Sequence, residues 1–151
     1  MDKRLNVLIV EDSIADAEIA VLSLEASGLK VRSRRVETEL EYLMALRDEP
    51  DIVLSDHSMP AFDAPHALRL LREQGHDIPF IVVSGRIGEA AAVELMKAGA
   101  NDYVHKDNLE RLAMVVRREL GEAEDRRQAR VTAAKLYQQE HTLDTLMQNL
   151  R

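Results

Sequence analysis

Residues 5–12 read Leu-Asn-Val-Leu-Ile-Val-Glu-Asp, and this stretch decides the fold class of the chain. Every side chain in residues 5–10 except Asn6 is apolar. A short apolar run without polar alternation is typical of a strand buried on both faces of a parallel sheet. Two acidic residues, Glu11 and Asp12, follow the run directly. The chain therefore starts with a buried strand whose carboxyl end is acidic.

The alternation of an apolar run with a helical pattern repeats along the chain. After the first run, apolar residues recur at helical spacing from Ile14 to Leu24, and Gly28 supplies a stop. Further strands are predicted at residues 31–36, 51–56, 79–84 and 102–106. Further helices are predicted after a Thr38–Glu41 capping box, around Leu68, around Leu95, and after an Asn108 cap. Five strand–helix alternations predict a doubly wound α/β fold, a five-stranded parallel sheet with helices on both faces.

Acidic residues gather where such a sheet has its crevice, at the carboxyl ends of the strands. Glu11 and Asp12 end the first strand and Asp56 ends the third. Two unit charges 4 Å apart near a protein surface repel by about 4 kcal/mol at an effective dielectric constant of 20. A divalent cation that prefers oxygen ligands would relieve this repulsion, and Mg²⁺ (or Mn²⁺) suits a site with few carboxylates. With a cation present, Asp56 can act as a nucleophile toward an anionic phosphoryl group.

Two other strand ends carry groups that complement a phosphate. Ser84 ends the fourth strand with a hydroxyl, and Lys106 ends the fifth with an ammonium. Taken singly, a strand-terminal serine is commonly a turn residue and a lysine is commonly solvated. Four strands that each end in a matching group favour a phosphate site over those separate explanations.

With these residues in place, the chain resembles the response-regulator receiver domains (CheY-like) over about residues 4–120. The residues that carry the resemblance are Glu11-Asp12, Asp56, Met59-Pro60, Ser84, Gly99-Ala100, Tyr103 and Lys106. The resemblance implies a flavodoxin-like sheet with strand order 2-1-3-4-5. It also implies that Glu11 or Asp12, Asp56 and the backbone carbonyl of Ser58 hold Mg²⁺.

The resemblance further implies a two-component signalling role without enzymatic turnover beyond the domain's own phosphotransfer and dephosphorylation. Asp56 would accept the phosphoryl group from a sensor histidine kinase or a phosphotransfer protein, and Ser84 and Lys106 would contact it. Tyr103 matches an aromatic switch that turns inward, although a half-buried tyrosine without that role also fits its position. The surface that changes would be formed by the fourth helix, the fifth strand and the fifth helix.

Some positions depart from the pattern of the family. Lys106 is followed by Asp107 instead of the usual proline, and a cis bond before a non-proline residue costs about 2.5–4 kcal/mol. We therefore expect a trans peptide there and a shifted last loop. Ser58 and Arg86 match positions that tune the lifetime of the phosphate. Arg86 would either hinder an attacking water or pair with Glu89, and the sequence does not decide between the two.

The composition changes from about Gly121 onward, where the chain becomes polar and rich in arginine and glutamine. Leucines then recur at seven-residue spacing, namely Leu136, Leu143 and Leu150, with Leu146 between them. This spacing predicts that the last helix continues into a coiled coil that forms a homodimer. A single solvated helix is the alternative, because Gln139 interrupts the pattern. We divide the chain into a receiver domain at residues 1–120 and a helical extension or linker at residues 121–151.

Charge and composition limit the partners. A net charge of -7 and an aromatic content of 3% argue against binding to nucleic acid. Residues 5–10 are far too few to cross a membrane, so we expect a cytoplasmic protein without a membrane partner. The sequence at Ser84-Gly85 and at residues 106–109 resembles that of receivers at the front of hybrid sensor kinases. On that hypothesis the chain is a fragment of a longer protein.

Three other functions compete with this interpretation. A nucleotide-binding domain is disfavoured because no glycine-rich phosphate loop follows the first strand. A phosphatase with an aspartyl nucleophile typically needs a second aspartate two positions later, where this chain has Ser58. A receiver-like interaction module that is never phosphorylated stays open, because His57 and Asp107 depart from the family pattern.

Overall fold

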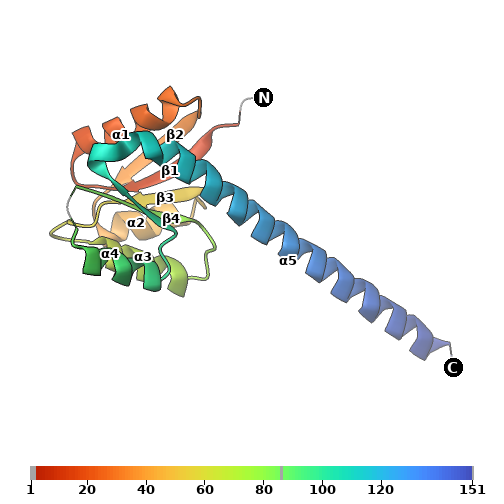
Figure 1. Cartoon of the computed structure of the whole chain (residues 1–151). Coiled ribbons are helices and arrows are strands. Elements are labelled where there is room, and N and C mark those ends of the chain that lie inside the picture. The colour runs from red at the N-terminus through yellow and green to blue at the C-terminus, as the bar shows by residue number, and fades with distance from the viewer. Residues whose placement is uncertain (1–2, 86, 151) are drawn as a thin grey trace. The chain divides into compact units, whose positions relative to one another are not determined.

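The computed structural model of the protein describes residues 3–85 and 87–150, in which strands and helices alternate (Figure 1). The strands are β1 (Leu5–Val10), β2 (Val31–Val36), β3 (Ile52–Ser55), β4 (Phe80–Ser84) and β5 (Asp102–His105). The helices are α1 (Ile14–Ala26), α2 (Glu39–Leu46), α3 (Ala64–Glu73), α4 (Glu89–Lys97) and α5 (Leu112–Asn149). A 3₁₀ helix, η1 (Lys106–Arg111), lies between β5 and α5.

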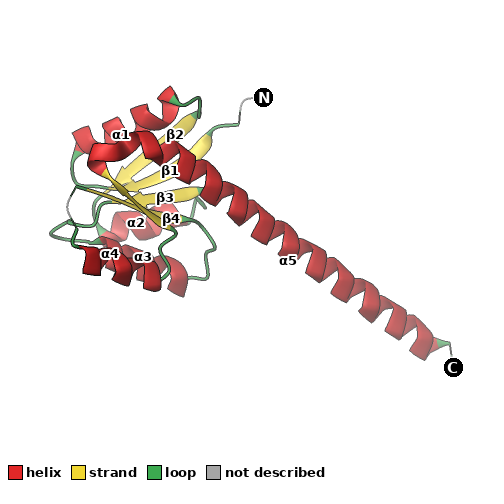
Figure 2. Ribbon diagram, in the orientation of Figure 1, coloured by secondary structure: helices red, strands yellow, loops and turns green. Residues whose placement is uncertain are grey.

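The five strands form one parallel sheet in the order β2-β1-β3-β4-β5, which confirms the predicted doubly wound, flavodoxin-like fold. Helix α1 and the first turns of α5 cover one face of the sheet, and α2, α3 and α4 cover the other (Figure 2). After β1 the chain moves outward to β2 and then returns to β3 on the other side of β1. The strand order reverses between β1 and β3, and this is where a ligand crevice is expected.

Alternate residues of β1 pack on opposite faces of the sheet. Val7 and Ile9 belong to the core cluster that contains residues of α1 and α5, whereas Leu8 and Val10 belong to the cluster under α2, α3 and α4. All four side chains are at most 4% exposed. Both faces of the strand are therefore buried at residues 7–10, which is why these four residues are all apolar.

Several helix boundaries lie where the sequence predicts them. The side chain of Thr38 accepts a hydrogen bond from the backbone of Glu41, and the Glu41 carboxylate accepts one in return, so the predicted capping box forms. Helix α1 is followed by Gly28 with φ at +98°. A left-handed residue of this kind ends a helix at little cost only when it is glycine.

The start of the last helix differs from the prediction. Asn108 does not cap it: this residue has φ -130° and ψ 47° inside η1, and α5 begins only at Leu112. His105 caps the 3₁₀ helix instead: its Nδ1 accepts a hydrogen bond from the backbone N–H of Asp107 at 3.0 Å. The Lys106–Asp107 peptide is trans, as predicted. Leu112 and Val116 are fully buried on the predicted core face of α5.

Contacts divide the chain into two units, residues 1–120 and residues 121–151, and α5 runs from one into the other. Side chains in residues 121–150 are nearly all exposed. Large apolar side chains on this segment are Val131, Leu136, Tyr137, Leu143, Leu146, Met147 and Leu150. Among residues 3–85 and 87–150 no helix combines the length and the apolar character that a membrane span requires.

Strand β2 is one outer strand of the sheet, and it is rich in arginine. Arg32 and Arg34 are exposed, and Arg34 pairs with Asp48 across 3.1 Å. Arg35 is partly buried, and its guanidinium donates a hydrogen bond to the backbone carbonyl of Glu11 at 3.0 Å. Arg32 and Arg34 thus give the outer strand a positive charge, and Arg35 holds the backbone at the carboxyl end of β1 in place.

Candidate functional site

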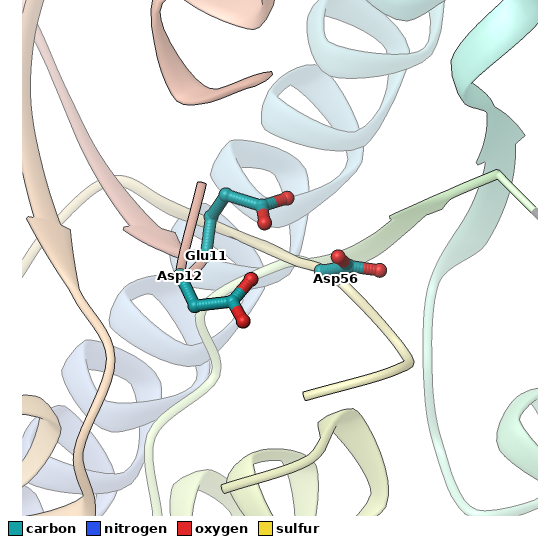
Figure 3. Close-up of side chains that lie close together, drawn as sticks. All are labelled: Glu11, Asp12 and Asp56. Atoms are coloured by element: carbon teal, nitrogen blue, oxygen red, sulfur yellow. The ribbon is translucent and has the colours of Figure 1, made fainter. Parts of the chain in front are cut away.

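The carboxyl ends of β1 and β3 lie side by side and carry the acidic residues. Val10 is the register partner of Ser55, and the backbone N–H of Asp56 donates to the Val10 carbonyl at 2.9 Å. Glu11, Asp12 and Asp56 each place a carboxylate oxygen within 4.8 Å of the other two (Figure 3). The structure therefore brings together the three carboxylates that the sequence analysis selected.

The three carboxylates differ in their surroundings. Glu11 and Asp56 are buried, with 4% and 8% of their surfaces exposed, whereas Asp12 is exposed. Burial raises the pKa of the Glu11 carboxyl to about 7, against hydrogen bonds from Lys106 and Ser13 that lower it. Buried and exposed carboxylate oxygens at this spacing are the ligand type that Mg²⁺ prefers, so the residues present fit a magnesium site.

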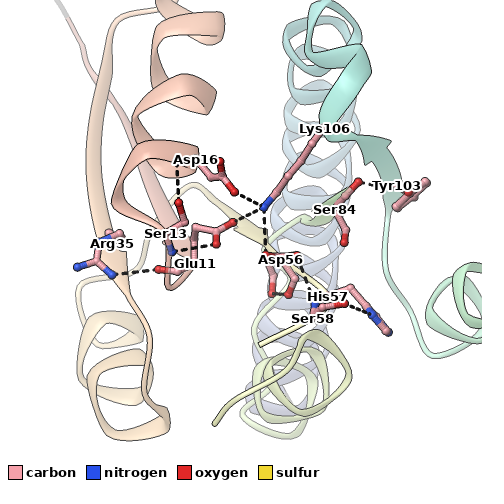
Figure 4. Close-up of polar contacts among 11 residues, drawn as sticks. Glu11, Ser13, Asp16, Arg35, Asp56, His57, Ser58, Ser84, Tyr103 and Lys106 are labelled. Atoms are coloured by element: carbon pink, nitrogen blue, oxygen red, sulfur yellow. Dashed lines mark hydrogen bonds and ion pairs between the residues drawn. The ribbon is translucent and has the colours of Figure 1, made fainter. Parts of the chain in front are cut away.

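Lys106 supplies the positive charge of the crevice. Its Nζ lies 2.9 Å from Glu11 Oε2, 3.1 Å from Asp56 Oδ2 and 2.8 Å from Asp16 Oδ2 (Figure 4). Burial lowers the pKa of Lys106, but the hydrogen bonds to the three carboxylates outweigh it and raise the pKa above its ordinary value. The predicted pairing of Lys106 with Asp56 is thus present in the structure.

Asp16 also belongs to this cluster, although its position was not predicted from the sequence. Ser13 is the N-cap of α1, and its Oγ accepts a hydrogen bond from the backbone of Asp16 at 3.2 Å. This bond fixes Asp16 in the first helical turn, and its side chain points to Lys106 (Figure 4). The available signal was the N-cap serine, because a helix that begins at the crevice directs part of its first turn toward it.

The remaining predicted residues lie around Asp56. Ser84 is 1% exposed at the end of β4, and the hydroxyl of Tyr103 on β5 lies 3.4 Å from its backbone carbonyl (Figure 4). The backbone N–H of Ser58 donates to Asp56 Oδ1 at 3.3 Å. Arg86 lies outside the described residues.

The family model of the response regulator receiver domain matches residues 7–117. The chain belongs to this family, whose members are the receiver domains of two-component systems and are signalling domains, not classical enzymes. Receiver domains bind Mg²⁺ at an acidic pocket and interact with histidine kinases or phosphotransfer proteins.

Two curated relatives illustrate the match. The C4-dicarboxylate transport transcriptional regulatory protein DctD of Pseudomonas aeruginosa is 32% identical over 105 residues, which is 70% of this chain and 22% of the relative. The response regulator MprA of Mycolicibacterium vanbaalenii is 34% identical over 102 residues, which is 68% of this chain and 44% of the relative. The chain thus spans less than half the length of either relative.

Solved structures show the same fold. The signal receiver domain of a LuxO repressor protein from Vibrio parahaemolyticus has a TM-score of 0.75 and 23% identity, covering 84% of this chain and 98% of that one. The receiver domain of a signal transduction histidine kinase from Syntrophus aciditrophicus has a TM-score of 0.66 and 31% identity, covering 77% and 89%. Receivers attached to kinases and receivers of regulators are therefore both similar to this chain.

Proposed function

We propose that Asp56 is the phosphoacceptor of a two-component receiver. The observation that carries the proposal is the convergence of Lys106 and the carboxylates of Glu11 and Asp12 on one buried aspartate. A structural role for Asp56 alone requires neither an ammonium at 3.1 Å nor two further acids. A nucleophilic carboxylate accounts for both, because an anionic phosphoryl group approaches only where positive charge offsets its own, and the two acids would hold a cation that adds to the charge of Lys106.

The transfer needs one bond to form and one to break. An Asp56 carboxylate oxygen attacks phosphorus, and the bond from phosphorus to the donor nitrogen of a phosphohistidine breaks with its electron pair going to the imidazole, which takes up a proton from water. Glu11, Asp12, Asp56 and the backbone carbonyl of Ser58 would hold Mg²⁺ (or Mn²⁺), which supplies positive charge to the phosphoryl oxygens. Lys106 and the Ser84 hydroxyl donate hydrogen bonds to those oxygens.

The readout runs through Tyr103. Its hydroxyl donates a hydrogen bond to the backbone carbonyl of Ser84. A movement of Ser84 toward the phosphate alters this bond and lets the Tyr103 ring turn inward. The surface of α4, β5 and α5 then differs between the two states. Ser58, two residues after Asp56, and Arg86 are the residues we assign to tuning the lifetime of the phosphate.

The partners follow from the same scheme. A sensor histidine kinase or a phosphotransfer protein in the cytoplasm supplies the phosphoryl group, and neither nucleic acid nor a membrane is a partner. Residues 121–151 form a homodimer by pairing their exposed leucines. The similarity to the receiver domain of a signal transduction histidine kinase supports the attachment of this receiver to a kinase.

Intact mass spectrometry after incubation with acetyl phosphate and Mg²⁺ tests the acceptor. The wild-type chain should gain the mass of one phosphoryl group, and Asp56→Asn should gain none. Asp107→Asn serves as the matched control, because this aspartate has a side chain that is 93% exposed and lies next to Lys106. Uptake that persists unchanged in Asp56→Asn contradicts the assignment, and a wild-type chain that takes up nothing favours the interaction module that is not phosphorylated.

A further inference from the structure

All three hydrogen-bond donors of the Lys106 ammonium are in use before any phosphate arrives. An ammonium has three N–H groups, and three carboxylate oxygens surround this one. Asp16 lies at 2.8 Å, Glu11 at 2.9 Å and Asp56 at 3.1 Å. For Lys106 to donate to a phosphoryl oxygen, one of these contacts must therefore be exchanged.

The contact with Asp16 is the one that is released most easily. Its side chain is 40% exposed, whereas those of Glu11 and Asp56 are 6% and 10% exposed. A carboxylate released toward water is rehydrated, but a buried carboxylate that loses its partner remains desolvated and unpaired. The backbone of Asp16 is also held by Ser13, so the side chain can turn away without disturbing α1.

We propose that Asp16 is a positioning residue that holds Lys106 on the α1 side of the crevice and releases it when the phosphoryl group arrives. The release half of this inference rests on the proposed phosphorylation of Asp56. In the unphosphorylated protein, Asp16 draws part of the ammonium charge away from Asp56. The carboxylates of Glu11, Asp12 and Asp56 then bind a cation more tightly than they would without Asp16. In the phosphorylated protein, its carboxylate competes with the phosphoryl oxygens for Lys106.

Loss of the Asp16 charge therefore has two consequences of opposite kind. In Asp16→Asn, the Lys106 ammonium interacts more strongly with the carboxylates of Glu11 and Asp56, and the crevice loses one negative charge. Both changes weaken Mg²⁺ binding to the unphosphorylated protein, by about fivefold for a partly exposed ion pair. Once Asp56 is phosphorylated, Lys106 has one competitor fewer, so the aspartyl phosphate should persist about fivefold longer.

Three variants of the full chain separate positioning from mere folding. Asp16→Asn removes the charge at almost constant size, and Asp16→Glu restores a carboxylate that is one methylene longer. Glu18→Gln is the matched control, because Glu18 is an exposed carboxylate on the same helix. The first readout is the exchange rate of the Lys106 ammonium protons with water, followed by ¹⁵N NMR at low temperature without metal or phosphodonor.

The holding half predicts faster ammonium exchange and weaker Mg²⁺ binding in Asp16→Asn, recovery in Asp16→Glu and no change in Glu18→Gln. Exchange or Mg²⁺ affinity equal to wild type in Asp16→Asn overturns it, whatever Asp56 does. The release half predicts a longer phosphate lifetime in Asp16→Asn, and an unchanged or shorter lifetime overturns that half alone. A wild-type chain that accepts no phosphate overturns the proposed function and the release half, while the exchange rates still decide the holding half.

Discussion

At the scale of single residues, Glu11 is a carboxyl group whose burial disfavours its charged form. It is 4% exposed, and burial raises its pKa from 4.5 to about 7 despite the hydrogen bonds with Lys106 and Ser13. The native protein therefore binds more protons than the unfolded chain between these two pH values. Under that condition, the free energy of unfolding decreases as pH rises.

We predict that the metal-free protein loses stability as pH rises from about 4.5 to about 7, with a total change on the order of 3 kcal/mol. The measurement is urea unfolding in the presence of a chelator at several pH values. Glu11→Gln cannot ionise, so its stability should change less over this range. Parallel curves for the two proteins would mean that Glu11 does not carry the pH dependence.

The residues of the crevice could be predicted to different degrees. Glu11 and Asp56 follow apolar runs, Lys106 follows the short predicted fifth strand, and the carboxyl ends of parallel strands meet at one edge of the sheet. Asp16 could not be placed in the same way, because the direction of a helical side chain depends on the rotation of the helix about its axis. That rotation is set by the packing of Ala17, Ala20 and Leu24 on the sheet, which no local pattern determines.

At the scale of elements, Arg72 joins the loop before β4 to the loop before β5. Its guanidinium donates to the backbone carbonyls of His76, Ile78 and Gly99 at 3.3, 2.9 and 2.9 Å, and to the side chain of Asn101 at 2.9 Å. Asn101 in turn accepts a hydrogen bond from the backbone of Phe80 at 2.8 Å. One side chain of α3 thereby fixes the loops before β4 and before β5.

We expect Arg72→Lys to lower the free energy of unfolding by about 1.5–3 kcal/mol, because an ammonium is a point charge and cannot span the acceptors that the planar guanidinium reaches. Arg69→Lys is the control on the same helix. Arg69 is exposed and lies 3.7 Å from Glu73, so its replacement should change stability by less than about 0.5 kcal/mol. Equal losses in chemical denaturation would show that the loops are not held by Arg72.

The strands were predictable as elements, whereas the link between β5 and α5 was not. Buried strands show apolar runs in the sequence, and those of β1 and β4 are unbroken except at Asn6 and Ser84. Asn108 has the side chain of an N-cap, but the nearby Nδ1 of His105 binds the backbone of Asp107 and begins a 3₁₀ turn first. Two local caps compete within four residues, and the sequence does not rank them.

At the scale of the whole chain, the apolar side chains of residues 121–150 lead to a prediction about assembly. Leu143 is 58% exposed and belongs to the seven-residue repeat. If this repeat pairs two chains, Leu143→Lys should convert a dimer into a monomer in sedimentation equilibrium, since it places charges in the seam. Thr145→Lys adds the same charge on a different side of the helix and should leave the dimer intact. A monomeric wild type would support the single solvated helix.

The arginines of β2 have a consequence for how such molecules can associate. An outer strand exposes unpaired backbone groups, and a flat apolar edge invites a strand from a second molecule and then aggregation. Arg32 and Arg34 place guanidinium groups along this edge of the sheet, where a second copy would bring the same charges against them. Growth of the sheet from one molecule to the next is disfavoured on this side. Charge on β2 therefore acts against the formation of extended β-structure through this strand.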